Sequence, residues 1–301
     1  MTEQRKGLLA LVTATVIWGL SSLYYAQFRH MPPIEVLCYR SLWSLLFFGA
    51  ILLFQGRIGQ LWQSVNTIPK LGIVATAALL IAANWFGFIF AIKFGYAVEA
   101  SLGYYIFPIV AVLLGRVFLG ERLSIWQLCA VGLATAAVII LTAGLGVPPW
   151  IALGLAGTFG IYGLIKKRIT LGPVLSVTAE VLVLAPFVVF YLVIWGARDL
   201  TLWTHVLLFG SGPLTGVTLV LFAYGSRRVA LSTVGIMQYI NPTLQFIVAT
   251  TVFLEPFTVW HQIAFALIWT GVGIYCVAAI RQDRSARKAA SREATLGTVV
   301  T

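Results

Sequence analysis

The stretch Tyr105-Ile106-Phe107-Pro108 recurs 134 residues further along the chain as Tyr239-Ile240-Asn241-Pro242. The same offset, without a gap, relates Glu121 to Glu255, Trp126 to Trp260, Lys93 to Arg227 and Asn84 to Thr218. A match at one fixed offset over so long a region indicates an internal duplication. Copies that each hold an odd number of membrane helices must lie upside down relative to each other, which is an architecture of secondary transporters.

The composition requires lipid as the solvent. The chain has 301 residues, 60% of them hydrophobic and 10% charged, with a mean hydropathy of +0.96. So much apolar surface cannot be buried inside one soluble globule. Apolar runs of about 20 residues predict ten membrane helices, at 7–27, 34–54, 70–92, 97–119, 123–143, 148–166, 174–196, 203–224, 229–254 and 259–280. The connections are short, so no soluble domain fits between them.

The distribution of Lys and Arg predicts the orientation. With the N-terminus in the cytoplasm, sixteen basic residues lie on that side and only Arg29, Lys93 and Arg198 on the other, while Arg40 lies within a segment. This excess puts both termini in the cytoplasm. The predicted fold is an all-α membrane protein of two inverted five-helix repeats, at 1–143 and 148–280. Residues 281–301 form a basic cytoplasmic tail that we expect to be disordered.

Arg40 and Glu180 are ionisable residues at equivalent depths in the second and seventh segments. Inversion puts them in opposite leaflets, so we do not expect them to pair with each other. Intramembrane charges are costly and are candidates for coupling or gating. For Arg40 we expect an ion pair with Glu99, and the alternative is a structural or snorkelling arginine. Glu180 is the candidate for proton coupling, against a purely structural ion pair.

Amides and aromatic side chains gather at the predicted membrane midplane. Asn84 and Trp85 lie in the third segment, and Gln238, Tyr239 and Asn241 in the ninth. This chemistry suits an amphipathic substrate, although each amide alone could equally join two helices by hydrogen bonds. Trp18 lies deep enough in the first segment to line the same cavity.

Several residues are predicted to shape the helices themselves. Pro108 and Pro242 lie mid-segment, where each is expected to bend or unwind its helix and to act as a hinge. Glu121 and Glu255 are expected to stabilise short turns. A glycine ridge predicts the close approach of another helix to the sixth segment, at Gly154, Gly157, Gly160 and Gly163.

The run Glu99-Ala100-Ser101-Leu102-Gly103-Tyr104-Tyr105, followed by Pro108 and Leu119-Gly120-Glu121-Arg122, resembles a signature of EamA-type transporters in the drug/metabolite transporter superfamily. Ile17-Trp18-Gly19, Arg40 and Tyr162-Gly163-Leu164 extend the resemblance, which is greatest to the RarD group. The resemblance implies a ten-helix inner-membrane exporter of small metabolites or drugs, with a central cavity to which Tyr104, Tyr105 and Tyr162 contribute. The RarD group is associated with chloramphenicol. Phe107 stands where the family tends to have Asn, so a symmetric polar site is not expected.

The leading hypothesis is a secondary transporter of small amphipathic metabolites, such as amino acids, or of drugs, working by alternating access in the bacterial inner membrane. An uncoupled facilitator with the same cavity is the alternative. The sequence contains no G-x-S-x-G, H-E-x-x-H or Walker A motif and no clustered His or Cys, so we expect neither an enzyme nor a bound metal or cofactor. The expected partners are the substrate and the lipid bilayer, without nucleic acid. The oligomeric state stays open and a monomer is compatible with it.

Overall fold

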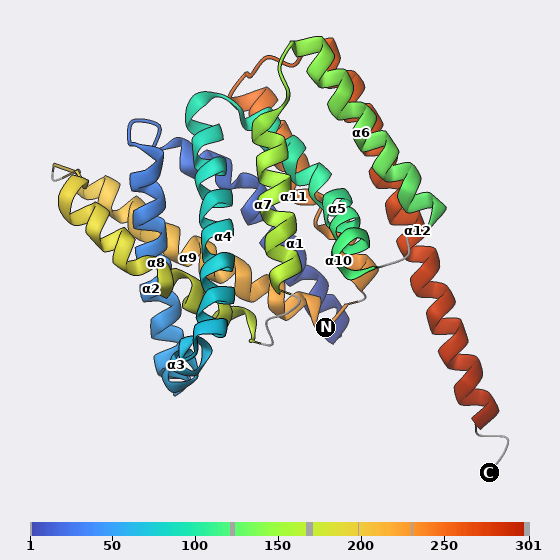
Figure 1. Ribbon diagram of the computed structural model, residues 1–301, viewed down its shortest axis with the longest axis horizontal. Helices are drawn as coiled ribbons and strands as arrows, with labels where there is room; N and C mark the ends of the chain where they lie inside the picture. The colour runs from blue at the N-terminus through green and yellow to red at the C-terminus, as the bar shows by residue number, and fades with distance from the viewer. Residues whose placement is uncertain (1, 121–123, 167–170, 198, 230, 298–301) are drawn as a thin grey trace.

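The computed structural model describes residues 2–120, 124–166, 171–197, 199–229 and 231–297, and the regular structure in these ranges is helical (Figure 1). The elements are α1 (Glu3–Ala26), α2 (Pro33–Phe54), α3 (Ile58–Val65), α4 (Ile68–Phe94), α5 (Ala97–Leu119), α6 (Ile125–Leu145), α7 (Trp150–Lys166), α8 (Pro173–Trp195), α9 (Leu202–Ser226), α10 (Leu231–Met237), α11 (Ile240–Ile247), η1 (Val248–Val252) and α12 (Val259–Gly297).

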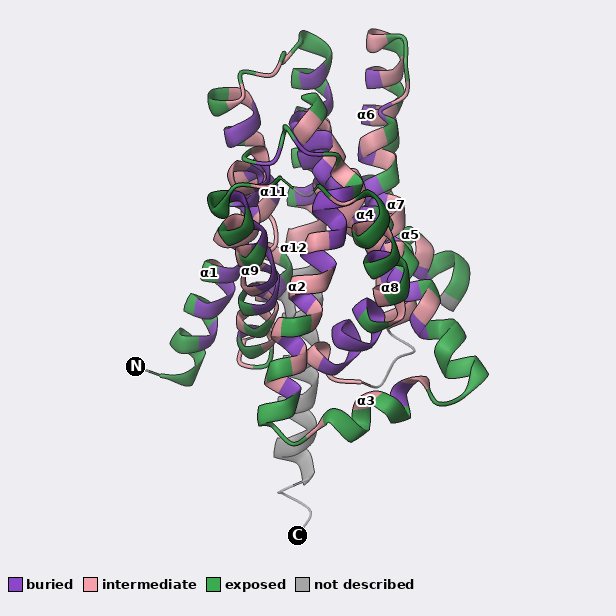
Figure 2. Ribbon diagram, turned by 90° about the vertical axis from the view of Figure 1, so that its left-hand side faces the viewer, coloured by how far each residue is buried: buried purple, intermediate pink, exposed green. Residues whose placement is uncertain are grey.

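Eight of these helices are long and apolar enough to cross a membrane, namely α1, α2, α4, α5, α6, α8, α9 and α12. A further apolar helix, α7, has 17 residues. Large apolar side chains such as Phe54, Phe187 and Val193 are exposed, and exposed residues lie on the outer faces of the helices (Figure 2). Lipid is the solvent that matches such a surface. The chain is therefore an all-helical membrane protein.

The predicted ninth segment, 229–254, is not one continuous helix. It is divided into α10, α11 and the π-helical η1, and Gln238 and Tyr239 lie between α10 and α11. Pro242 explains the break, because it has no N–H to donate to the carbonyl of Gln238 and its ring crowds that carbonyl. Pro108, at the related position, lies inside α5, which the structure assigns as one unbroken helix. An unwound turn therefore occurs beside Pro242 and not at Pro108.

Two stretches are helical where the sequence predicts no helix. The first is α3, an amphipathic helix of 8 residues that exposes Trp62. It is too short to register as an apolar run of membrane length. The second is the end of α12, which continues to Gly297 through the segment for which a disordered tail is expected.

The two halves of the chain interlock. Helix α5 packs on α7 as α11 packs on α1, and α4 packs on α7 as α9 packs on α1. When each helix is replaced by its counterpart in the other half of the chain, the α5–α7 contact becomes the α11–α1 contact, and the α4–α7 contact becomes the α9–α1 contact. The pairs α2 with α8 and α6 with α12, which lie side by side in Figure 1, map onto themselves. Each half therefore supplies part of every central contact, so neither is a separate bundle.

Close helix approach depends on glycines in the central helices. A Cβ on Gly103 of α5 would lie 2.8 Å from the carbonyl oxygen of Ala152 in α7, and one on Gly19 of α1 would lie 2.6 Å from Leu244 Cβ in α11. The predicted ridge on α7 contributes much less, because only Gly160 meets a neighbour there. A Cβ would meet nothing within 4 Å, among the described residues, at Gly154, Gly157 and Gly163. The ridge prediction is therefore wrong at three of its four positions.

Glu255 caps the N-terminus of α5. Its two carboxylate oxygens accept hydrogen bonds of 2.8 Å from the backbone N–H groups of Ala97 and Val98. These N–H groups have no partner within their own helix, and the helix dipole favours a negative charge at this end. Glu255 therefore stabilises the start of a distant helix, whereas the sequence predicts that it stabilises its own short turn. Glu121 lies outside the described residues.

Candidate functional site

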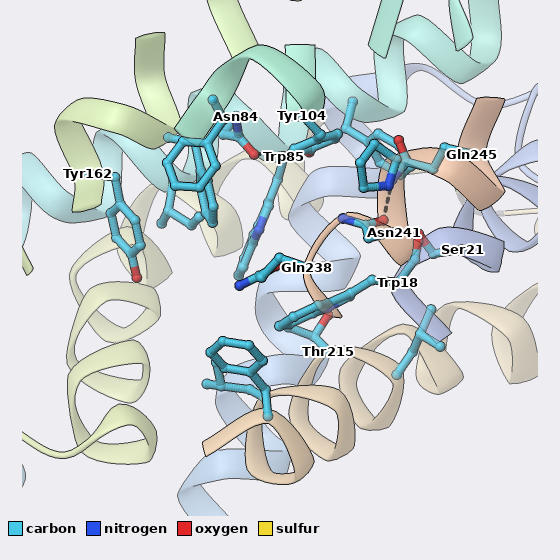
Figure 3. Close-up of a pocket in the computed structure, with 18 of the residues that line it drawn as sticks. Trp18, Ser21, Asn84, Trp85, Tyr104, Tyr162, Thr215, Gln238, Asn241 and Gln245 are labelled. Atoms are coloured by element: carbon cyan, nitrogen blue, oxygen red, sulfur yellow. Dashed lines mark hydrogen bonds between the residues drawn. The ribbon is translucent and has the colours of Figure 1, made fainter. Parts of the chain in front are cut away.

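A cavity of about 240 Å³ lies at the centre of the bundle, between helices from both halves of the chain. One water needs only roughly 10–15 Å³ by a comparable measure, so the space takes a larger guest. Helices α1, α2, α4 and α5 form one part of its wall, and α7, α8, α9 and α11 with the α10–α11 break form the other. Figure 3 shows Trp18, Trp85 and Gln238 directed into this shared space.

Most of the predicted site residues line this cavity: Trp18, Arg40, Asn84, Trp85, Tyr104, Pro108, Tyr162, Gln238, Tyr239, Asn241 and Pro242. Three predicted residues do not line it, namely Tyr105, Glu99 and Glu180. Tyr105 points away from the cavity, and its ring packs against Phe265 and Trp269 of α12. The hydroxyl of Tyr105 instead bonds Thr243 Oγ1 at 2.6 Å.

Other lining residues follow from helical spacing. Gln245 lies one turn after Asn241, and Phe159 lies three residues before Tyr162, so each shares a face with a predicted residue. This spacing is the feature of the sequence from which both residues could have been predicted to line the cavity. Tyr25 lies two turns after Trp18 and has the same signal, whereas Thr215 and Phe222 belong to a long apolar segment without a predicted site residue.

The amides at the cavity wall are used in different ways. Asn84 donates to the carbonyl of Leu155 at 3.0 Å and to Thr158 Oγ1 at 3.2 Å, and accepts from the Tyr104 hydroxyl at 3.2 Å. It is 2% exposed. Its amide therefore joins α4 to α7 and α5, which is the helix-joining alternative that the sequence left open.

The amides near the helix break are freer. Gln245 donates from Nε2 to Asn241 Oδ1 at 2.8 Å, which leaves the Asn241 NH₂ group available (Figure 3). The side chain of Gln238 makes no hydrogen bond to another described residue and lies beside the break that Pro242 imposes. This side of the cavity therefore presents amides that a ligand can engage.

Arg40 is the charged residue on the wall. Its guanidinium carbon lies 4.1 Å from the ring centroid of Trp85 and 5.2 Å from that of Tyr25, and the residue is 8% exposed. The predicted ion pair with Glu99 is absent, so that prediction is wrong. Glu99 instead lies beside the backbone N–H groups at the start of α7, where a helix N-terminus favours a carboxylate. Depth in the membrane was the only guide to pairing in the sequence.

Glu180 lies behind the cavity wall in a polar cluster. It is fully buried, and its Oε1 accepts from Lys166 Nζ at 2.5 Å and from Ser176 Oγ at 2.9 Å. Its Oε2 accepts from the Tyr162 hydroxyl at 2.9 Å. Lys166 also bonds Ser176. Since Tyr162 lines the cavity, this residue connects the cavity wall to the buried carboxylate.

Unsatisfied polar atoms concentrate on the cavity wall. Among the described residues, four cavity-lining side chains hold a buried polar atom without a hydrogen-bond partner: Tyr25 (Oη), Arg40 (Nε), Tyr239 (Oη) and Gln245 (Oε1). Buried polar groups are nearly always paired in native proteins. Four of the eight such atoms among the described residues therefore belong to side chains around this one cavity.

These features define a polytopic membrane protein with a solute-sized cavity between two interlocked halves, and the comparisons with known proteins agree. Residues 5–143 match the EamA-like transporter family. A Streptomyces exfoliatus protein named RarD is 38% identical, with 99% of this chain and 96% of that protein covered. An uncharacterized transporter of Bacillus subtilis, YojE, is 37% identical over 95% of this chain and 98% of its own length.

The fold has a counterpart among solved structures. One crystal structure superposes with a TM-score of 0.61 and 18% identity, and it covers 90% of this chain and 97% of its own. This likeness concerns the fold alone. The sequence relatives carry the family assignment: the chain belongs to the EamA-like transporter family and, within it, to the group of RarD proteins.

Proposed function

We propose that this protein is a secondary transporter that exports small amphipathic metabolites or drugs across the bacterial inner membrane by alternating access around the central cavity. The observation that carries the proposal is the set of unpaired polar atoms on a wall that is otherwise mostly apolar. Binding sites of this kind are mostly apolar, with a few polar groups that fix the ligand. Export is the direction that the family resemblance implies.

The proposed topology is ten membrane helices in two inverted repeats with cytoplasmic termini. Two observations support it. The central contacts exchange between the halves under the 134-residue repeat, and the basic residues gather on one predicted side. The divided ninth segment counts as one span, made of α10, α11 and η1. Transporters of this kind place broken helices at the substrate site, and the α10–α11 break lies at this cavity.

We assign the hinge to Pro242 and, in the other repeat, to Pro108. Gln238 and Tyr239 can change their backbone angles at low cost because the helix is already interrupted there. Rocking at this break would move both side chains relative to Trp85 and Trp18 on the opposite wall. The cavity would then open to the two membrane faces in turn.

For coupling, we propose that Glu180 exchanges a proton during the cycle, with Tyr162 relating its charge state to the contents of the cavity. The carboxylate holds three partners in this structure. A change in any of them alters the electrostatic environment of the carboxylate. An uncoupled facilitator needs the same cavity but gives Glu180 and Lys166 only a structural role.

The transport test uses purified protein in proteoliposomes with three labelled probes: phenylalanine, hydrocinnamate and chloramphenicol. We expect counterflow of at least one probe, reduced about tenfold or more by Gln238→Ala, in line with the loss of one or two hydrogen bonds. Gln60→Ala, which changes an exposed amide outside the cavity, is the matched control. If every probe moves no faster than in empty liposomes, the transporter proposal fails.

The coupling test compares the wild type with the double variant Lys166→Gln, Glu180→Gln. The double change removes both charges, so neither is left buried alone. A coupled transporter accumulates its probe when a pH gradient is imposed, and the double variant retains counterflow but loses this accumulation. A wild-type protein that ignores the gradient would establish the facilitator instead.

A further inference from the structure

Arg40 is the one charged side chain that lines the cavity within the described part of the chain. Its Nε is buried without a hydrogen-bond partner, and no hydrogen bond joins its guanidinium to a described residue. A charge held in this way inside a membrane protein is unfavourable unless a partner completes it. The cavity therefore has an unmet requirement for negative charge.

The orientation of Arg40 determines what kind of partner fits. Trp85 and Tyr25 lie against the guanidinium at 4.1 and 5.2 Å. These contacts satisfy the charge only in part and use none of the N–H groups. The N–H edge of a guanidinium matches a planar carboxylate, which can accept two parallel hydrogen bonds.

The nearby acidic residues contact other groups and do not pair with Arg40. Glu35, on the same helix as Arg40, accepts a 2.7 Å hydrogen bond from the backbone N–H of Ala197. Glu99 lies at the N-terminus of α7, and Glu180 is paired with Lys166. None of these three carboxylates lines the cavity. The negative partner for Arg40 must therefore come from the guest molecule.

We propose that the cavity binds small organic carboxylates as net anions, with the carboxylate on Arg40 and an apolar, preferably aromatic, body among Trp18, Phe159 and Phe222. This proposal rests on the transport function and specifies its substrate class. A zwitterion such as an amino acid fits less well, because no described acidic residue on the wall can pair with its ammonium group. An ammonium beside an uncompensated Arg40 would be repelled.

The test uses three probes that share one carbon skeleton: hydrocinnamate, which is an anion, its neutral amide, and phenylalanine, a zwitterion. Binding to the full-length detergent-solubilised protein is measured by calorimetry and by the shift in thermal stability. The variants are Arg40→Gln and Arg40→Lys. The control is Arg57→Gln, which removes a positive charge from the α2–α3 connection, away from the cavity.

We expect the wild type to bind hydrocinnamate about tenfold or more tightly than either other probe, the size of effect expected for a charge-assisted Arg–carboxylate pair. Arg40→Gln should remove this preference, Arg40→Lys should keep part of it, and Arg57→Gln should leave it unchanged. Chloramphenicol, which is neutral, reports whether the variants keep an intact cavity.

Three outcomes overturn the proposal. Equal binding of the anion and its amide by the wild type, tighter binding of phenylalanine, or a preference that survives Arg40→Gln would each do so. In these cases a ligand still binds, and the transport function stands without the anion preference. If none of the probes binds the wild type and none is transported, the proposed function itself fails along with the substrate class.

Discussion

The hydroxyl of Tyr162 donates a 2.9 Å hydrogen bond to Oε2 of Glu180. One end of this contact lies on the cavity wall and the other on a fully buried carboxylate. It therefore joins the cavity in which we propose that a substrate binds to the buried carboxylate for which we propose a coupling role. A contact of this kind is where binding and protonation can influence each other.

Tyr162→Phe tests this connection while preserving the shape of the wall. We expect counterflow to continue and accumulation driven by a pH gradient to fall by about tenfold, the equivalent of one hydrogen bond to a charged group. Transport in proteoliposomes provides the measurement. Tyr104→Phe is the matched change, because that hydroxyl donates to Asn84 and to no acid. A pH response lost in both variants, or in neither, would contradict a specific role for Tyr162.

We expect Asn84→Ala to lower mainly the stability of the fold and Gln238→Ala to weaken mainly ligand binding. Asn84→Ala leaves the carbonyl of Leu155 and two hydroxyls short of a partner, so we expect a loss of about 1–3 kcal/mol in unfolding free energy. Gln238→Ala should change stability by less than about 0.5 kcal/mol but weaken ligand binding. Thermal unfolding and calorimetry on the same samples give both quantities. The interpretation is wrong if Gln238→Ala proves the more destabilising of the two.

Glu255→Ala removes the cap from α5. Both N–H groups at Ala97 and Val98 then lose their acceptor, and we expect a loss of about 1–2 kcal/mol, typical of an N-cap. Glu255→Gln should recover part of this, since one amide oxygen still accepts. Glu3→Ala removes an exposed carboxylate whose ion pairs with Lys6 and Arg228 lie in solvent, and it should lower the unfolding temperature by less than Glu255→Ala does. Equal stability of Glu255→Ala and the wild type would show that the cap contributes nothing.

Gly103→Ala should separate α5 from α7. The added Cβ would lie 2.8 Å from a backbone oxygen of Ala152, which cannot move aside as a flexible side chain can, and overpacking of this kind costs about 1–3 kcal/mol. Gly163→Ala meets nothing within 4 Å and should be neutral or stabilising by up to about 1 kcal/mol. The difference in unfolding temperature between the two variants is the readout. A Gly103→Ala protein as stable as Gly163→Ala would mean that the helices adjust freely.

The membrane helices could be predicted because each one depends on the hydrophobicity of a single local stretch of sequence. A run of about 20 apolar residues is long enough to span the hydrocarbon core wherever the rest of the chain lies. The helix α3 escaped this criterion because its 8 residues are amphipathic and short. Pro242 predicted the break at Gln238 and Tyr239. Pro108, which follows a similar sequence, nevertheless lies in an unbroken helix. A proline weakens a helix, and the neighbouring helices decide whether it breaks.

The candidate site was predictable as a set of residues, but its pairings were not. Depth in the membrane predicted that Trp18, Trp85, Gln238 and Asn241 share one cavity, and all four line the same cavity. Depth also predicted an ion pair between Arg40 and Glu99. In the structure Arg40 instead lies beside two aromatic rings, and Glu180 forms an ion pair with Lys166. Side chains at equal depth can point to different neighbours, because helix rotation is fixed by packing with other helices.

The sequence by itself determined that this chain is a helical membrane protein, because apolar run length and charge distribution are local or additive properties. Its motifs also resemble those of the EamA-like family. Only the tertiary structure decided that Arg40 lacks a partner, that Asn84 joins helices and that Tyr162 contacts Glu180. Those relationships depend on distances of a few ångströms between residues far apart in the chain. Rotation of a helix by a single residue position, about 100°, would change each relationship in which that helix takes part while leaving the hydropathy pattern the same.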